Sequence, residues 1–208
     1  RKLWPAHKRI VGYLPTGGGK TRCAARIIEG FYNRNLRVCF TVPRLSLIAQ
    51  TVRSFADLGL LDVSVLQGGT EYNDKARVTV ASIDTLIRRK KLAFDLVIVD
   101  EAHKKRKKLL EWMENYPQER YLMLTATPFP KWMGEYCTAL AKGSSMADLI
   151  SMGRLAPYDV YAPDVPDTTA CKLRMTDDGP DFTESALAEI MDGAKIVGKV
   201  VQNWLENG

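Results

Sequence analysis

Short apolar runs alternate with segments of helical periodicity along the first two-thirds of the 208-residue chain. Some of these runs are apolar at every position, as in residues 96–99 (LVIV), and so predict strands that are buried on both faces. Strands of this kind joined by helices are typical of a parallel sheet covered on both sides, which predicts an α/β doubly wound fold. Strands are expected at residues 10–14, 37–42, 63–66, 78–81, 96–99 and 121–124. Helices are expected from Lys20 onward and over 45–55, 82–89 and 109–115.

The composition changes after about residue 143. Several prolines and aspartates follow, which predicts an extended, loop-rich stretch. Near its end the chain carries one apolar helical stripe, formed by Ile196, Val197, Val200, Val201, Trp204 and Leu205. Such a stripe needs a partner surface. We therefore expect a domain at 1–143, and at 144–208 an extended connector with helices that leads to a second domain outside this chain.

The bulk properties exclude some classes of protein. The net charge of +6 favours a polyanionic partner, although only mildly. The four cysteines and two histidines lack the spacing of a zinc or redox site, so reduced thiols are the simpler interpretation. No apolar run approaches the roughly 20 residues that a membrane span needs, and no signal peptide is recognisable. We expect a soluble, cytoplasmic protein with no membrane partner.

A glycine-rich loop lies between the first expected strand and the first expected helix. Glycines let backbone N–H groups curl around phosphates, and the start of a helix adds its positive dipole end. Lys20 would place its charge on the β and γ phosphates of a nucleotide, and the Thr21 hydroxyl would bind Mg²⁺. The cofactors expected are therefore ATP and Mg²⁺. The residues expected to bind ATP are Pro15, Thr16, Gly17, Gly18, Gly19, Lys20 and Thr21.

Two adjacent carboxylates follow the buried run at residues 96–99. In an open α/β sheet the chemistry lies at the carboxyl ends of the strands. We assign Asp100 to the metal and Glu101 to the water that it orients or deprotonates. Lys20, Asp100 and Glu101 are thus the candidate catalytic residues. A later expected strand ends near Thr125 and Thr127, whose hydroxyls could bond to this acidic pair (the acidic box) and relay its state. An ordinary strand end with capping threonines would give the same pattern.

Together these residues resemble the superfamily 2 helicases and translocases of the DEAD/DEAH-box type. Residues 15–21 (PTGGGKT), 100–103 (DEAH) and 125–127 (TAT) look like their motifs I, II and III. Residues 41–45 with Gln50 resemble motif Ia, residues 80–86 resemble motif Ib, and 68–69 resemble a short glycine element between the two. The match covers about residues 10–130, and 149–163 look like the lead to a second RecA-like domain. XPB-like and phage or bacterial helicases, which also resemble restriction-enzyme motor subunits, are the most similar.

The resemblance implies a RecA-like P-loop NTPase domain that couples ATP hydrolysis to movement on nucleic acid. It implies a coupling role for His103 with Thr125 and Thr127. It also implies contacts with a nucleic-acid backbone by Pro43, Arg44, Gly68, Gly69, Ser82 and Thr85. Two family features are absent, namely the adenine-reading glutamine before motif I and the second domain with its arginine fingers. We therefore expect this chain to bind ATP-Mg²⁺ but to hydrolyse ATP poorly by itself.

Several hypotheses about function stay open. The first is the N-terminal motor domain of an ATP-dependent helicase or translocase, with DNA preferred over RNA. The alternatives are the motor part of a restriction-modification nuclease and an ATP-responsive clamp that does not travel. A small-molecule kinase is disfavoured by the DEAH and TAT motifs.

The basic run at residues 104–108 predicts a solvated face, while a phosphate or partner role stays open. Oligomeric state is not indicated.

Overall fold

The computed structural model describes residues 3–68, 72–89, 92–158, 169, 171–176, 179–183, 185, 186, 188, 204 and 205. The chain divides into two compact units, Arg1–Ala156 and Pro157–Gly208, and each is described here by itself. The first unit contains a seven-stranded sheet and the second a two-stranded hairpin. The domain boundary expected after residue 143 stays a prediction.

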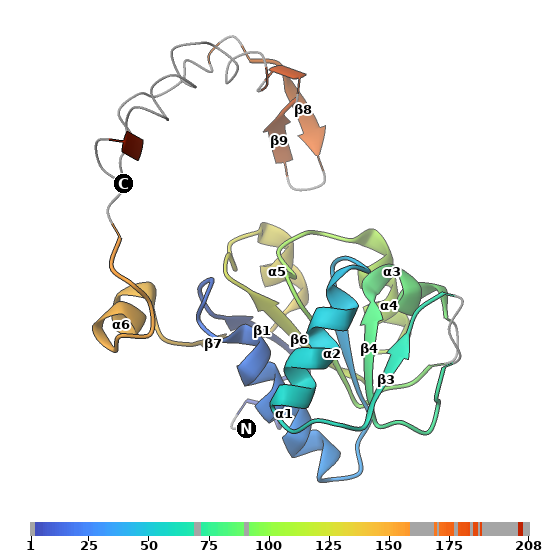
Figure 1. Cartoon of the computed structure of the whole chain (residues 1–208). Coiled ribbons are helices and arrows are strands. Elements are labelled where there is room, and N and C mark those ends of the chain that lie inside the picture. The colour runs from blue at the N-terminus through green and yellow to red at the C-terminus, as the bar shows by residue number, and fades with distance from the viewer. Residues whose placement is uncertain are drawn as a thin grey trace. The chain divides into compact units, whose positions relative to one another are not determined.

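The large sheet is parallel throughout. Its strands are β1 (Arg9–Tyr13), β2 (Val38–Val42), β3 (Val63–Leu66), β4 (Val78–Ser82), β5 (Leu96–Val99), β6 (Arg120–Thr125) and β7 (Ala139–Lys142). They lie in the order β3-β4-β2-β5-β6-β1-β7, and every pairing is parallel. The predicted α/β fold with a parallel sheet is confirmed (Figure 1).

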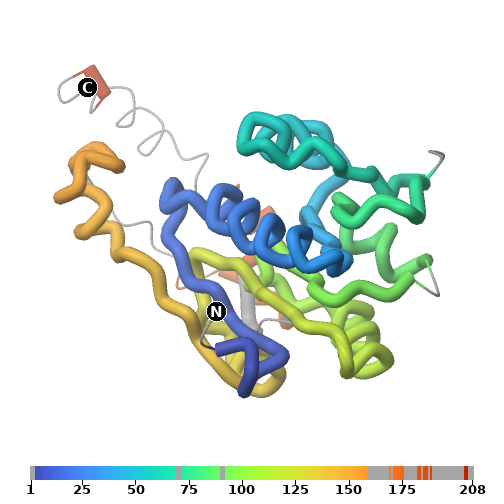
Figure 2. The backbone as a smooth tube through the Cα atoms, turned by 90° about the horizontal axis from the view of Figure 1, so that it is seen from below, coloured from blue at the N-terminus to red at the C-terminus, as the bar shows by residue number. Residues whose placement is uncertain are grey.

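Helices cover both faces of this sheet. They are α1 (Lys20–Tyr32), α2 (Leu47–Asp57), α3 (Ile83–Arg88), α4 (Lys107–Asn115) and α5 (Lys131–Tyr136). A sixth helix, α6 (Met146–Ser151), has no buried residue and covers neither face. Helices α1 and α2 lie on one face, and α3, α4 and α5 lie on the other (Figures 1 and 2). Among the described residues, no helix combines the length and the hydropathy that crossing a membrane requires.

The alternation of side chains along the strands produces two hydrophobic cores. In β5, Leu96 and Ile98 pack in one core, together with Ile28 of α1 and Phe55 of α2. The intervening residues of β5 pack in the other core, with α3, α4 and α5. Successive residues of a strand point to opposite faces of the sheet, so a strand covered on both sides must be apolar throughout. This is why the continuous run at residues 96–99 predicts the strand correctly.

Several elements were not predicted from the sequence. They are the edge strand β7, the short helices α5 and α6, and the antiparallel hairpin of β8 (Leu173–Thr176) and β9 (Gly179–Phe182) in the second unit. Most of the apolar stripe expected near the end of the chain lies outside the described residues. Its two described members, Trp204 and Leu205, are helical and exposed.

The strand order places the predicted motifs side by side. The carboxyl ends of β4, β2, β5, β6 and β1 are neighbours along one edge of the sheet. The glycine loop follows β1 and the acidic pair follows β5. Between them, Thr125 ends β6 and Thr127 follows it. All of these residues therefore meet at the edge where open α/β sheets carry their ligand sites.

Candidate nucleotide-binding site

The glycine loop connects β1 to α1 in a conformation that only glycine adopts readily. Gly17 and Gly19 have φ angles of 74° and 80°, in the left-handed region where a side chain is strained. The Gly18 N–H donates to the Pro15 carbonyl at 2.9 Å and closes the turn. Nothing lies within 4 Å of a Cβ built on Gly19, so the loop leaves open space at the start of α1. This is the arrangement that a phosphate group needs.

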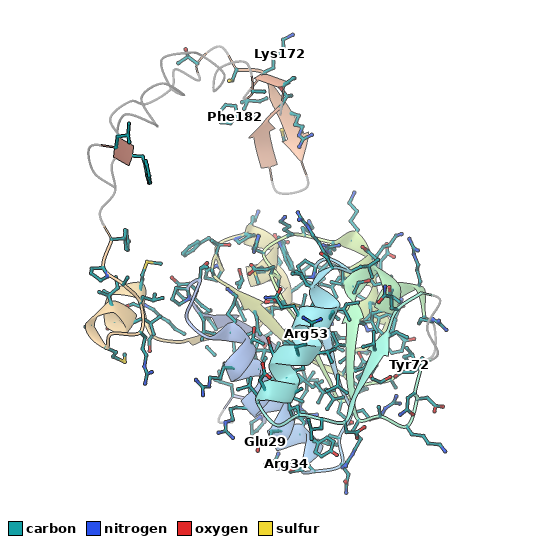
Figure 3. All side chains as sticks on the ribbon, in the orientation of Figure 1. Glu29, Arg34, Arg53, Tyr72, Lys172 and Phe182 are labelled. Atoms are coloured by element: carbon teal, nitrogen blue, oxygen red, sulfur yellow. The ribbon has the colours of Figure 1, made fainter. Side chains whose placement is uncertain are left out.

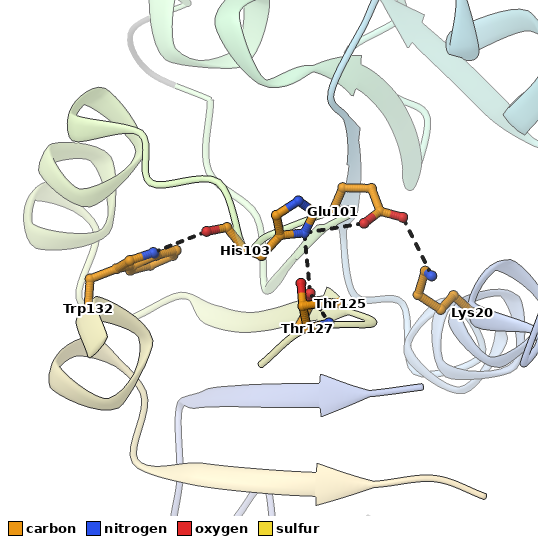
Figure 4. A network of polar contacts seen from close by, with 6 residues as sticks. All are labelled: Lys20, Glu101, His103, Thr125, Thr127 and Trp132. Carbon is orange, nitrogen blue, oxygen red and sulfur yellow. Dashed lines mark hydrogen bonds and ion pairs between the residues drawn. The ribbon is translucent and has the colours of Figure 1, made fainter. Parts of the chain in front are cut away.

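Lys20 and Glu101 face each other across the site. The Lys20 Nζ lies 3.5 Å from the Glu101 Oε1, although the two residues come from opposite sides of β6 (Figure 4). The Lys20 side chain is only 13% exposed, whereas that of Glu101 is 37% exposed. The half-buried ammonium therefore has a carboxylate as its partner, and a phosphate could take that place because it carries the same sign of charge.

Glu101 has an unusual backbone. Its φ of 49° lies in the left-handed region, which costs a residue other than glycine of the order of 1–3 kcal/mol. Hydrogen bonds on both sides hold it there. The Asp100 N–H donates to the Thr41 carbonyl, and the Ala102 N–H donates to the Leu124 carbonyl, each at 3.0 Å. The loop is therefore fixed to the ends of β2 and β6, and this aims the Glu101 carboxylate at Lys20.

Asp100 lies in a setting that disfavours its charge. Burial raises the pKa of the Asp100 carboxyl, and the neighbouring Glu101 carboxylate raises it further. The Glu101 N–H and the Lys20 ammonium act in the opposite direction, with smaller effects. A nearby cation would favour the ionised form of Asp100, so this carboxyl suits a position beside a metal ion.

His103 links the acidic box to the end of β6. Its Nδ1 lies 3.4 Å from the Glu101 Oε2 and 3.4 Å from the Thr125 Oγ1 (Figure 4). The Thr127 N–H donates to the Thr125 Oγ1 at 3.0 Å, so the two threonines form one connected turn. The structure thus brings together Lys20, Glu101, His103 and Thr125 in one polar network.

Trp132 was not predicted to take part in this network. The sequence favours a core position for it, and the residue is buried at 4% exposure. Its indole Nε1–H also donates to the His103 carbonyl at 3.3 Å. Leu155 is a second residue whose position beside the glycine loop was not expected from the sequence. A Cβ on Gly17 would lie 2.8 Å from its Cδ2. Trp132 belongs to none of the motifs and Leu155 only to the segment 149–163, so only the fold identifies these contacts.

The residues expected to contact nucleic acid have mixed surroundings. Arg44 is exposed and Pro43 half-buried in the loop after β2, and Gly68 is exposed after β3. Ser82 differs from expectation because its side chain is buried and its Oγ accepts the Thr85 N–H at 3.2 Å, which caps α3. Gly69 lies outside the described residues.

Comparison with known proteins identifies relatives. The family model described as "Type III restriction enzyme, res subunit" matches residues 2–130. A 51.5 kDa protein of a Lactococcus phage (isolate 7-9) is 29% identical over 203 residues, which are 93% of this chain and 40% of that protein. The uncharacterized ATP-dependent helicase YqhH of Bacillus subtilis (strain 168) is 33% identical over 123 residues, which are 54% of this chain and 22% of that protein. The chain thus spans less than half the length of these relatives.

Solved structures have the same fold. The UvsW helicase from bacteriophage T4 matches 65% of this chain and 55% of its own, with a TM-score of 0.58 and 19% identity. The Type ISP restriction-modification enzyme LlaGI, solved in complex with a DNA substrate mimic, matches 74% of this chain and 19% of its own. Its TM-score is 0.57, with 15% identity.

Proposed function

The chain belongs to the family of the type III restriction enzyme res subunit, and from this premise we propose that it is the ATP-hydrolysing part of a motor that moves on DNA. It contains an N-terminal RecA-like domain of the superfamily 2 helicase type. The proposal goes further than the family and the fold, because it assigns ATP, Mg²⁺ and DNA as the ligands of this domain. The observation that carries it is the distance of 3.5 Å between the Lys20 Nζ and the Glu101 Oε1.

That distance matters because Lys20 and Glu101 have complementary roles in the proposed hydrolysis of ATP. In the proposal, Lys20 neutralises the β and γ phosphates, and Glu101 orients the attacking water or takes its proton. The two roles are compatible only if both side chains reach the same triphosphate. A pair within 4 Å satisfies this condition, since a γ phosphate that displaces the ion pair would contact Lys20 and lie close enough to Glu101 for one water between them.

The residues present fit a magnesium ion. Among the described residues, no group of three or more His, Cys, Asp or Glu side chains gathers as a metal cage. Mg²⁺ does not need one, because it is usually held by one or two carboxylates together with substrate phosphates and waters. Asp100, whose pKa is raised by burial, would supply the carboxylate, and Thr21 would supply a hydroxyl. The ion would neutralise charge that develops on the transferred phosphoryl group.

The nucleic-acid ligand is proposed as DNA. The family description concerns a restriction enzyme, and LlaGI was solved with a DNA substrate mimic. Arg44 is the exposed cation of the loop after β2, next to the site. Since Ser82 is occupied as a helix cap, we propose that Arg44 and backbone N–H groups make the phosphate contacts. Such contacts fix the register of a strand without reading its sequence.

This proposal predicts salt-sensitive binding of single-stranded DNA. The logarithm of the association constant is expected to fall linearly with the logarithm of salt concentration, by about 0.7 for each phosphate neutralised on a single strand. Arg44→Ala should reduce that slope by about one such contact. Fluorescence anisotropy with oligonucleotides of several sequences measures both effects. Arg53→Ala, on the exposed side of α2 (Figure 3), is the control and should leave the slope unchanged. Salt-independent binding would count against the proposed DNA contacts.

A restriction-modification motor subunit is the second candidate, and the family description favours it. The two candidates share the same ATP site and differ in whether movement feeds a nuclease. In either case this chain alone is proposed to turn over ATP slowly, because an arginine finger from a second domain is typically worth 10³–10⁵ in rate.

A further inference from the structure

One side chain of the basic run at residues 104–108 turns inward. The Arg106 side chain is 28% exposed, and its guanidinium contacts two other segments of the chain. Its Nη1 lies 3.5 Å from the Asp84 Oδ1 in the first turn of α3. Its Nη2 donates to the Pro43 carbonyl, in the loop after β2, at 3.4 Å. The solvated face expected for the whole run is therefore wrong at this position.

These contacts connect the two halves of the proposed site. Arg106 is the residue before α4 and lies in the same loop as Glu101, which faces Lys20, and His103, which contacts Glu101. Pro43 lies in the loop after β2, and Asp84 lies in the first turn of α3. These are the two segments assigned to the nucleic-acid backbone. One guanidinium thus connects the nucleotide-facing loop to both segments. A planar fork can hold two acceptors at once, whereas an ammonium is a single point charge.

A purely stabilising role does not account for this arrangement well. The Asp84 side chain is 63% exposed, and an ion pair in such a setting adds little to the stability of a fold. Both contacts are also long for hydrogen bonds, at 3.4 and 3.5 Å. A movement of the loop by a fraction of an ångström would therefore strengthen or break them, which is the property that a coupling element needs.

We propose that Arg106 is a positioning residue that couples occupancy of the nucleotide site to affinity for nucleic acid. When MgATP displaces the Lys20–Glu101 pair, the loop that carries Glu101 shifts, and Arg106 transmits that shift to Pro43 and Asp84. The inference rests on the proposed function, because it assumes that both ligands bind. Coupling is reciprocal, so the affinity for MgATP must change with DNA by the same factor.

The test measures binding of a labelled single-stranded DNA oligonucleotide to the 208-residue chain, with and without Mg²⁺ and a non-hydrolysable ATP analogue. The ratio of the two dissociation constants gives the coupling factor, which is about 5–150 in typical allosteric systems. Arg106→Ala and Arg106→Lys should both bring the ratio close to one. Asp84→Asn should also lower the ratio, although removal of a negative charge would by itself tighten DNA binding.

Lys108→Ala is the matched control, since it removes an exposed positive charge from the same helix start. It should weaken DNA binding equally with and without the ATP analogue, so the ratio of the two dissociation constants should stay unchanged. A wild-type ratio in Arg106→Lys would overturn the inference, because charge alone would then suffice. Independent binding of the two ligands to the unaltered chain would also overturn it while the proposed function stands. Failure of the unaltered chain to bind the ATP analogue would instead reject the proposed function, and the inference with it.

Discussion

Replacing Lys20 with alanine should weaken the binding of MgATP by at least about 30-fold. The ammonium is only 13% exposed and lies 3.5 Å from a carboxylate, so it is held at the position where the phosphates would bind. In the proposed complex Lys20 pairs with the phosphates, and truncation of one partner of such a ligand-covered, hydrogen-bonded charge pair costs about 2–5 kcal/mol, which is at least about 30-fold in affinity. The change should not unfold the chain, because α1 is anchored by Ala24, Ile28 and Phe31 in the core.

Isothermal titration calorimetry with a non-hydrolysable ATP analogue and Mg²⁺ measures this loss. Arg22→Ala is the control, because Arg22 lies in the same helical turn and is exposed. It should bind the nucleotide as the unaltered chain does. Equal affinities for Lys20→Ala and Arg22→Ala would mean that Lys20 does not contact the phosphates.

Glu101→Gln should separate binding from chemistry. The amide keeps the size of the side chain but cannot accept a proton from water, and general-base catalysis typically contributes about 10²–10⁴ in rate. We therefore expect MgATP to bind with similar or higher affinity, because a negative charge next to the phosphates is removed. The rate of ATP turnover should fall by about 10²–10⁴. The left-handed backbone at this position strains glutamine as it strains glutamate, so stability should change little.

Single-turnover release of phosphate, with the protein in excess over ATP, measures this rate even when it is slow. Glu111→Gln, on the exposed side of α4, is the matched control and should have the rate of the unaltered chain. An unchanged rate in Glu101→Gln would remove Glu101 from the catalytic role. Loss of nucleotide binding in the same variant would mean that its role is structural.

The sequence predicts most strands of the large sheet well because their signals are local. The strands at Val63–Leu66 and Leu96–Val99 have the bounds expected from their apolar runs. The glycine loop lies between a strand and a helix as expected, since its function and its conformation need the same residues.

The peripheral elements are less predictable for physical reasons. Strand β7 (ALAK) has alternating half-buried and exposed residues and no β-branched side chain. It forms because its backbone pairs with β1, and that pairing leaves no pattern in the sequence. Its low intrinsic preference for a strand is overridden by tertiary context.

Long-range contacts also escape prediction within the site. Five basic residues in succession look equivalent in the sequence, and only the positions of Pro43 and Asp84 show that Arg106 contacts these two segments. Glu119 is a second example, outside the site and at the other end of β6, because an acidic residue in a turn is expected to face solvent. It is instead buried at 6% exposure and accepts hydrogen bonds from Phe94, Trp112 and Tyr121.

The central claim is that Lys20 and Glu101 act on one nucleotide, and a crystal structure of the chain with Mg²⁺ and a non-hydrolysable ATP analogue tests it most directly. We expect the γ phosphate between the Lys20 ammonium and the Glu101 carboxylate, in place of their present contact at 3.5 Å, with the metal beside Asp100. A triphosphate bound elsewhere on the chain, with the Lys20–Glu101 ion pair intact, would contradict the account.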